Sequence, residues 1–318
     1  DRLVISDKDA PGLLDVFHFI YSIYYQKSRS RKENYLQNCF TRGMLCLKMV
    51  SDSCFLSVPI GSHCGPGMPT KTIRTESVVV IMKILSLGSL NIDLVYSVSH
   101  INLEGETLSA RERETKQGGK GLNQSVALAR AGAEVYMAGC VGPDGEELVR
   151  TLEDSGVDTG LIRRLEEPSG HAIIQLADSG ANSIIIYGGA NRKITPEMID
   201  ETLARFGPGD YILLQNEISN VDYAIRSAKE RGLKVAFNPS PISEELPTYP
   251  LELVDVFLLN ELEGQTLSGA ASEEGSRVLA ALAGKFPGAA IVLTLGDKGA
   301  MYHGGGQELT CPAHKVPV

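Results

Sequence analysis

An alternation of apolar runs with helical patterns, which begins at Met82, constrains the fold more than any other feature of the sequence. The run MKILSLGSL (82–90) is typical of a buried parallel strand. Helical patterns follow over 122–132 and 146–156, with a strand pattern over 134–142 between them. Repeated strand–helix–strand units favour a parallel sheet that is covered by helices on both faces.

The alternation continues along the chain. Thr195 and Pro196 predict the N-cap and first residue of a helix that reaches about Phe206, because proline needs no N–H at that position. We predict an α/β fold with a doubly wound, mostly parallel Rossmann-like sheet. Its remaining elements are predicted as strands over 211–216, 233–238, 255–260 and 290–295, and as helices over 220–231 and 272–285.

Two stretches, 94–117 and 171–187, break this rhythm because alternating apolar residues and turn residues replace helical patterns there. The second stretch has the pattern of a hairpin around Asp178-Ser179-Gly180. We predict that the two stretches form a small β subdomain, which serves as a lid over a site at the strand ends.

Residues 1–81 differ in character from the rest of the chain. They show little sustained periodicity, and a Gly/Pro cluster lies at 61–70. We interpret 1–81 as an atypical N-terminal extension that is not part of the native domain, and 82–318 as the domain itself.

The charge and the missing motifs exclude several classes of function. A net charge of −9 gives no general electrostatic reason to bind nucleic acid or an anionic membrane, so small molecules are the expected partners. The apolar run over 16–26 is too short to span a bilayer, and Cys140 and Cys311 lie in apolar strand-like segments, which suits a reducing cytoplasm. No HxxxH, HExxH, GxSxG or strand-following GxGxxG occurs, which disfavours metal hydrolases, serine hydrolases and nicotinamide dehydrogenases.

The strongest local signal is GGKGLNQS (118–125), at the predicted change from a β segment to a helix. Its glycines permit close approach of the backbone to a ligand, and the helix N-terminus offers unpaired N–H groups. The spacing is not that of a Walker A loop. The alternative interpretation is a glycine-rich turn and helix cap with an exposed lysine.

Polar residues also follow several predicted strands. Asn91 and Asp93 point the same way in an extended chain and suit paired sugar hydroxyls, although an Asx turn would explain them as well. Glu217, the segment 260–263 and the segment 294–299 occupy equivalent places after later strands. Ligands of doubly wound folds bind beyond such strand ends, so a shared cleft is favoured over independent caps.

Together these segments resemble the ribokinase family of carbohydrate kinases, and their order and spacing match from about Met82 onward. The lysine in the glycine segment favours the branch of the family that acts on ribose. The segments that carry the resemblance are GSLNID (88–93), GGKGLNQSVALARAGA (118–133), Glu217, FNPSP (237–241), NELE (260–263) and TLGDKG (294–299).

The resemblance implies ATP-dependent phosphorylation of a sugar hydroxyl, with Mg²⁺ and, in the full-length protein, a monovalent cation such as K⁺. It also implies that the β lid forms a homodimer. The sugar contacts that it implies are Asn91, Asp93, Gly119, Lys120, Gly121, Asn123 and Glu217. It places the nucleotide at Asn260, Thr294, Leu295, Gly296, Asp297, Lys298 and Gly299, and the magnesium ion at Glu263, which with Asn260 suits a hydrated Mg²⁺.

The family's DTxGAGD motif, whose last Asp is the catalytic base, does not occur in this sequence. No residue present is therefore assigned as catalytic; we expect the base beyond Val318 and expect the chain to be inactive as a C-terminally truncated product. Two alternatives stay open: a non-catalytic sugar-binding or regulatory protein, and a family kinase that acts on a fructose-type sugar or a nucleoside.

Overall fold

The computed structural model describes residues 82–313. The predicted N-terminal extension, 1–81, and residues 314–318 lie outside the described residues. Within 82–313, no helix combines the length and the apolar character that a membrane crossing requires.

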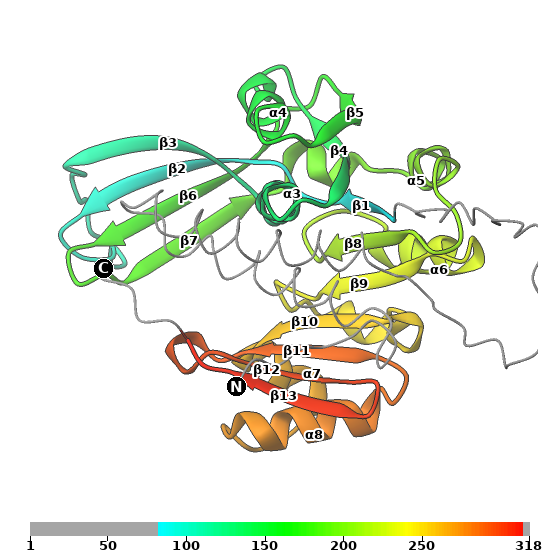
Figure 1. The fold of residues 1–318 in the computed structure, drawn as a ribbon. Helices are drawn as coiled ribbons and strands as arrows, with labels where there is room; N and C mark the ends of the chain where they lie inside the picture. Colours follow the sequence, from blue (N-terminus) through cyan, green and yellow to red (C-terminus); the bar gives the residue numbers. More distant parts are fainter. Residues whose placement is uncertain (1–81, 314–318) are drawn as a thin grey trace, which may run out of the picture. The chain divides into compact units, whose positions relative to one another are not determined.

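A large sheet forms the centre of the fold (Figure 1). Seven adjacent strands run parallel to one another, and the last two strands of the described chain complete one edge as an antiparallel meander. In spatial order the strands are β13 (Gln307–Cys311), β12 (Ala300–Gly304), β11 (Ala290–Thr294), β10 (Val256–Asn260), β9 (Lys234–Asn238), β8 (Tyr211–Gln215), β1 (Lys83–Leu87), β4 (Glu134–Val141) and β5 (Asp158–Arg164).

Alternate residues of the strands build two separate cores, one on each face of the large sheet. On β1, Leu85 and Leu87 pack with helices α5 (Pro196–Leu203), α6 (Val221–Glu230), α7 (Glu261–Ser268) and α8 (Gly275–Lys285). Ile84 belongs to the opposite core, with α3 (Lys120–Arg130) and α4 (Glu146–Glu153). Burial on both faces explains why the central strands are continuous apolar runs rather than alternating ones.

A second, four-stranded sheet extends away from the large one (Figure 1). Its order is β3 (Glu112–Gly118), β2 (Asn91–Val98), β6 (Gly170–Ala177) and β7 (Asn182–Tyr187), in which β2 and β6 are parallel and the outer pairs antiparallel. It contains both stretches that the sequence predicted as a β subdomain. However, β2 begins at Asn91, so Asn91 and Asp93 lie on a strand of this second sheet.

The order of strands reverses beside β1. The chain runs from β1 outward to β4 and β5, returns to β8 on the other side of β1, and continues outward to β13. In doubly wound folds, the loops that follow the two strands at such a reversal diverge, and ligands bind in the crevice between them.

The predicted elements are present, and several boundaries differ. The helix predicted to reach Phe206 ends at Leu203, and the helix predicted from Asn220 begins at Val221, because Asn220 takes a left-handed conformation. Thr195 is the expected N-cap and accepts from the Met198 N–H at 3.3 Å. Strands β5, β12 and β13 were not predicted, and Cys311 lies exposed on β13 rather than in an apolar environment, whereas Cys140 is buried.

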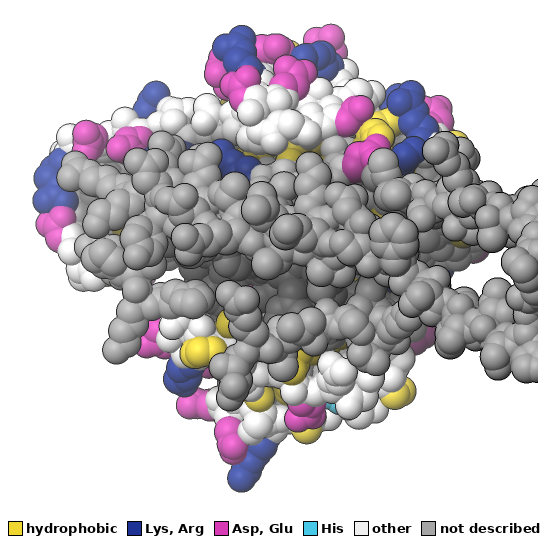
Figure 2. Space-filling view, viewed as in Figure 1, with side chains coloured by type: hydrophobic (Ala, Val, Ile, Leu, Met, Phe, Trp, Pro, Cys, Tyr) yellow, Lys and Arg dark blue, Asp and Glu magenta, His cyan; other side chains and the backbone are white. Residues whose placement is uncertain are grey.

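Charged side chains of both signs are interspersed on the face over α4 and β5 (Figure 2). Two ion pairs lie there, Arg150 with Glu147 at 2.6 Å and Arg164 with Glu146 at 2.8 Å. Such mixing leaves no field of a single sign on this part of the surface.

Candidate functional site

The buried carboxylate of Glu217 is the centre of a cluster at the β1–β8 reversal. Lys120 Nζ donates to Glu217 Oε1 at 2.5 Å, and the Lys120 backbone N–H donates to Oε2 at 3.3 Å. The hydroxyl of Ser89 donates to the same Oε2. Ser89 follows β1, Lys120 begins α3 and Glu217 follows β8, so three segments distant in sequence converge on one carboxylate.

Helix α3 points its N-terminus at this cluster. Its N-cap, Gly119, has φ 93°, and a Cβ there would approach the Ser89 carbonyl oxygen to 2.8 Å, so a side chain is excluded both by conformation and by space. The helix is fastened to β8 by a bond from Gln215 Nε2 to Gln124 Oε1 at 2.7 Å. The side chain of the N-cap residue does not cap α3. Instead, the Lys120 N–H donates to Glu217 Oε2, the Gly121 N–H donates to Ser89 Oγ at 3.3 Å and the Leu122 N–H donates to the Ser89 carbonyl at 3.0 Å.

Asp93 lies beside the cluster on β2. Burial and, to a smaller extent, the nearby Glu217 charge raise the pKa of this carboxyl from 3.8 to about 6, although the Lys120 charge opposes the shift. A carboxyl with a pKa near neutrality in a crevice is a marker of a functional site. Asp93 and Glu217 can both accept hydrogen bonds from hydroxyl groups, whereas Lys120 can donate them.

A second group of predicted residues lies two strands away, at the ends of β10 and β11. The register pairs Asn260 directly with Thr294. Asn260 and Glu263 form a capping box on α7: the Glu263 carboxylate accepts from the Asn260 N–H at 2.9 Å and from Nδ2 at 2.8 Å, and Asn260 Oδ1 accepts from the Glu263 N–H at 2.8 Å. The pair therefore has a structural role in starting the helix.

The segment after β11 is a tight turn at the same edge of the sheet. The Leu295 N–H donates to the Gly299 carbonyl at 2.8 Å, and η5 (Gly296–Lys298) lies between them. Gly296, Asp297 and Lys298 are exposed, and Lys298 Nζ lies 3.8 Å from Glu261. The turn thus places exposed backbone groups and the Lys298 side chain beside α7.

The structure brings the predicted residues together as two groups. Asn91, Asp93, Gly119, Lys120 and Glu217 surround the β1–β8 reversal, with Gly121 and Asn123 in the first turn of α3. The second group comprises Asn260, Glu263 and the segment 294–299, with β9 between the two groups. Sequence reasoning overlooked Ser89, although it stands between the strand end and Asn91 in GSLNID, where a buried polar residue could have been suspected.

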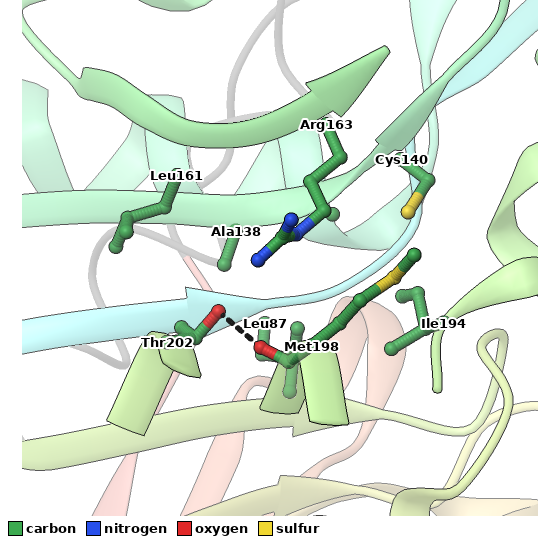
Figure 3. Close-up of a pocket in the computed structure, with 9 residues that line it drawn as sticks. Leu87, Ala138, Cys140, Leu161, Arg163, Ile194, Met198 and Thr202 are labelled. Atoms are coloured by element: carbon green, nitrogen blue, oxygen red, sulfur yellow. Dashed lines mark hydrogen bonds between the residues drawn. The ribbon is translucent and has the colours of Figure 1, made fainter. Parts of the chain in front are cut away.

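A small cavity elsewhere in the fold does not coincide with either group (Figure 3). It lies between β4, β5 and α5, and its volume of about 10 Å³ is roughly that of one water molecule. Burial raises the pKa of Cys140 in its wall to about 11, so that thiol stays protonated. The Thr202 hydroxyl, also in the wall, already donates to the Met198 carbonyl at 2.8 Å.

Three features together define a ribokinase-like α/β protein. They are a large sheet whose strand order reverses beside β1, a smaller sheet that begins next to this reversal, and the cluster of Glu217, Lys120 and Asp93. The chain belongs to the pfkB family of carbohydrate kinases, which matches residues 82–318. The enzymes of this family are phosphotransferases that act on sugars, and this protein is one of them by descent.

Similar proteins carry the name ribokinase. A ribokinase of Haemophilus influenzae is 38% identical over 223 residues, which are 67% of this chain and 72% of the relative. A ribokinase of Cryptococcus neoformans solved with ADP is 31% identical with a TM-score of 0.65, over 74% of this chain and 80% of that one. An Arabidopsis thaliana ribokinase solved with ribose and ATP is 30% identical with a TM-score of 0.60, over 73% of this chain and 77% of that one.

Proposed function

We propose that this protein binds D-ribose in the crevice between β1 and β8 and that its reaction is transfer of the ATP γ-phosphoryl group to a ribose hydroxyl, the O5. The observation that carries the proposal is the cluster of Lys120, Glu217 and Ser89, joined by Asp93 from the second sheet. Two carboxylates and an ammonium group around one crevice match a small polyhydroxylated ligand better than an apolar or anionic one.

The sugar contacts follow from hydrogen-bonding capacity. Asp93 and Glu217 accept from hydroxyl groups, and Lys120 and Asn91 donate to hydroxyl oxygens. Gly119 and Gly121 let the start of α3 approach the Ser89 backbone closely, and we propose that these glycines and Asn123, in the same first turn, line the sugar site. We give Asp93 and Glu217 binding roles and assign no catalytic base among residues 82–313.

The nucleotide site that we propose is the edge formed by β10 and β11. Thr294 and Leu295 lead into the turn at Gly296, Asp297, Lys298 and Gly299, and Asn260 lies beside Thr294. Lys298 would supply a positive charge near the phosphates, as phosphoryl transfer requires neutralisation of charge in its transition state.

Glu263 would hold Mg²⁺ through water. Both of its oxygens already accept from Asn260, and each keeps one lone pair for a water molecule. Mg²⁺ dehydrates reluctantly and keeps several waters, so the residues present fit an outer-sphere contact. When bound, the ion would neutralise phosphate charge. A monovalent cation such as K⁺ is a further expectation from the family.

One experiment separates the candidate activities. Ribose, fructose and adenosine are titrated calorimetrically into the chain, and ADP release is then measured with ATP, Mg²⁺ and each ligand. Ribose binding with ribose-dependent ADP release supports the kinase. Ribose binding without release supports a sugar-binding protein. Preference for fructose or adenosine, or no binding at all, contradicts the assignment of ribose.

We also propose that a second copy of this chain covers the exposed apolar residues of β6 and β7 and that the second sheet acts as a lid over the sugar. Ile184, Ile185, Ile186 and Tyr187 are between 48% and 64% exposed, which is unusual for such residues on a free sheet edge. The cytoplasm is the compartment that we propose, since the thiols of Cys140 and Cys311 are free.

A further inference from the structure

We propose that Asn191 is a positioning residue that fixes which end of the Asn91 carboxamide faces the ligand, and so sets the hydrogen-bonding polarity of the crevice. This inference rests on the proposed function, since it concerns a ligand hydroxyl beside Asn91. Asn191 is 1% exposed and belongs to η2 (Gly189–Lys193), which follows the last strand of the second sheet.

The orientation of Asn191 is dictated by the backbone of Leu90. The Leu90 N–H donates to Asn191 Oδ1 at 3.0 Å, and Asn191 Nδ2 donates to the Leu90 carbonyl at 3.2 Å. A backbone N–H can bond only an acceptor and a carbonyl only a donor. The Asn191 carboxamide therefore cannot be turned over without breaking both bonds in a buried environment.

The second hydrogen of Asn191 Nδ2 then determines the orientation of Asn91. Asn191 Nδ2 donates to Asn91 Oδ1 at 2.8 Å, so the Asn91 oxygen is used inside the protein. Its amino group, Nδ2, has no hydrogen-bond partner among residues 82–313, and it is not one of the buried atoms that lack a partner there, which are Ser86 Oγ and Gln215 Oε1. Asn91 thus offers a donor to the crevice.

Gly170 leaves room for the hydrogen bond between Asn191 and Asn91. Gly170 pairs with Asn91 at the start of β6, and a Cβ at Gly170 would collide with both Asn191 Nδ2 and Asn91 Oδ1. The Asn191 carbonyl also accepts from the Ser219 N–H at 3.3 Å, which links η2 to the segment after Glu217. Asn191 therefore connects the start of strands β2 and β6 with the segments that follow β1 and β8.

The consequence is a defined pattern of recognition. Asp93 and Glu217 require hydroxyl hydrogens from the ligand, whereas Asn91 requires a hydroxyl oxygen. A ligand that lacks the hydroxyl beside Asn91 leaves the Asn91 Nδ2 donor unpaired in the closed site. Because an unpaired buried donor costs free energy, such a ligand should bind more weakly than ribose.

The test compares ribose with its monodeoxy analogues by calorimetry. In the unmodified chain, one analogue should bind roughly 10-fold weaker or worse, because it lacks the oxygen that accepts from Asn91. Asn191→Asp keeps the size of the side chain but offers only acceptors, so Asn91 turns its own amino group toward it and its oxygen toward the ligand. Ribose should then bind roughly 10- to 100-fold weaker, and the penalty for that analogue should disappear.

Thr202→Val is the matched control, since it removes another buried hydrogen-bonding group far from the crevice. It should leave the ribose Kd and every deoxy penalty within about twofold. If Asn191→Asp does not fold, Gly170→Ala replaces it, because the new methyl group forces Asn191 and Asn91 apart while both carboxamides remain.

The outcomes are distinct. A folded variant with an unchanged deoxy profile, or with equal losses for ribose and all analogues, overturns the positioning role while the proposed function stands. Loss of the penalty for a single analogue supports it. Failure of the unmodified chain to bind ribose refutes the proposed function first, and the inference falls with it.

Discussion

At the scale of single residues, Glu217 is the most constrained group of the site. Its side chain is 6% exposed, and a charge so placed is tolerated only when donors surround it. Lys120 and Ser89 supply those donors. Lys120 is 32% exposed, so the pair has one end in the protein and the other toward the crevice.

Lys120→Met should lower stability by roughly 1–3 kcal/mol, because it leaves the Glu217 charge buried with fewer partners and the partial exposure of Lys120 moderates the loss. Adding Glu217→Gln to Lys120→Met should restore part of that loss, since the uncompensated charge is then gone. Chemical denaturation of both single variants and the double variant gives the coupling. Strictly additive effects would show that the two side chains do not interact in solution.

Asp93 gives a pH dependence with a definite sign. Its pKa is about 6 in the folded protein against 3.8 when exposed, so the folded state holds the proton more tightly. The stability that this proton provides is complete below pH 4 and is lost as the pH rises through 6. Asp93→Asn, which carries no titrating group there, should therefore be more stable than the unmodified protein above pH 6 and should lose this advantage below pH 4.

Denaturation midpoints measured from pH 4 to pH 8 check this prediction, with Asp154→Asn, at an exposed carboxylate that ends α4, as a control. A difference between Asp93→Asn and the unmodified protein that does not change with pH would mean that Asp93 titrates normally. The same substitution should weaken sugar binding at pH 8, so stability and binding should change in opposite directions.

At the scale of elements, the capping box on α7 allows the structural role of Glu263 to be tested apart from the role of its charge. Glu263→Gln retains an oxygen that can accept from the Asn260 N–H but places its amino group against Asn260 Nδ2, so stability should fall by about 1 kcal/mol. The variant lacks the negative charge, so the Mg²⁺ concentration needed for nucleotide binding should rise several-fold. Titration of ADP at graded Mg²⁺ measures this, and Glu263→Ala, which also loses the cap, is the destabilised comparison.

Strand β7 allows a test of association between copies. Ile185 is 64% exposed and pairs with Ile173 on β6, which is 37% exposed, so a continuous apolar surface crosses the two strands. Ile185→Lys places a charge in that surface and should shift the molar mass measured by light scattering toward that of one chain. Thr115→Lys, which places the same charge at an exposed position of β3 on the opposite edge of the sheet, is the control and should leave the molar mass unchanged. A monomeric unmodified chain would contradict the proposed dimer.

What the sequence could and could not predict also differs by element. The helix that begins at Thr195-Pro196 was predictable because a cap and a proline act locally. Strand β5 (DTGLIRR) was not, because it lies at an edge with polar residues and its pairing with β4 is a tertiary contact. Asn91, Asp93, Lys120 and Glu217 could be named from motifs, whereas Asn191 carries no local signal and acquires its role only through contacts with Leu90 and Asn91.

At the scale of the whole molecule, the two sheets should differ in local stability. The large sheet has a core on each face, whereas β3 and β7 are mostly exposed along their length. Amide hydrogen exchange should therefore be faster in β3 and β7 than in β1 and β8. Ribose should slow exchange at the root of β2, near Asn91, more than in β12 and β13. Equal protection of every strand by the sugar would argue against a lid that closes on the crevice.

The salt link between Lys120 and Glu217 joins positions 97 residues apart, and the second sheet is completed in the interval. During synthesis the glycine segment, the four strands of the second sheet and helices α3, α4 and α5 are therefore made before Glu217. At the sugar site proposed above, the ligand can stabilise only chains in which β8 has already docked beside β1, so it should not assist the first stages of folding. The proposed sugar ligand would therefore stabilise the large sheet only after its central strands have paired.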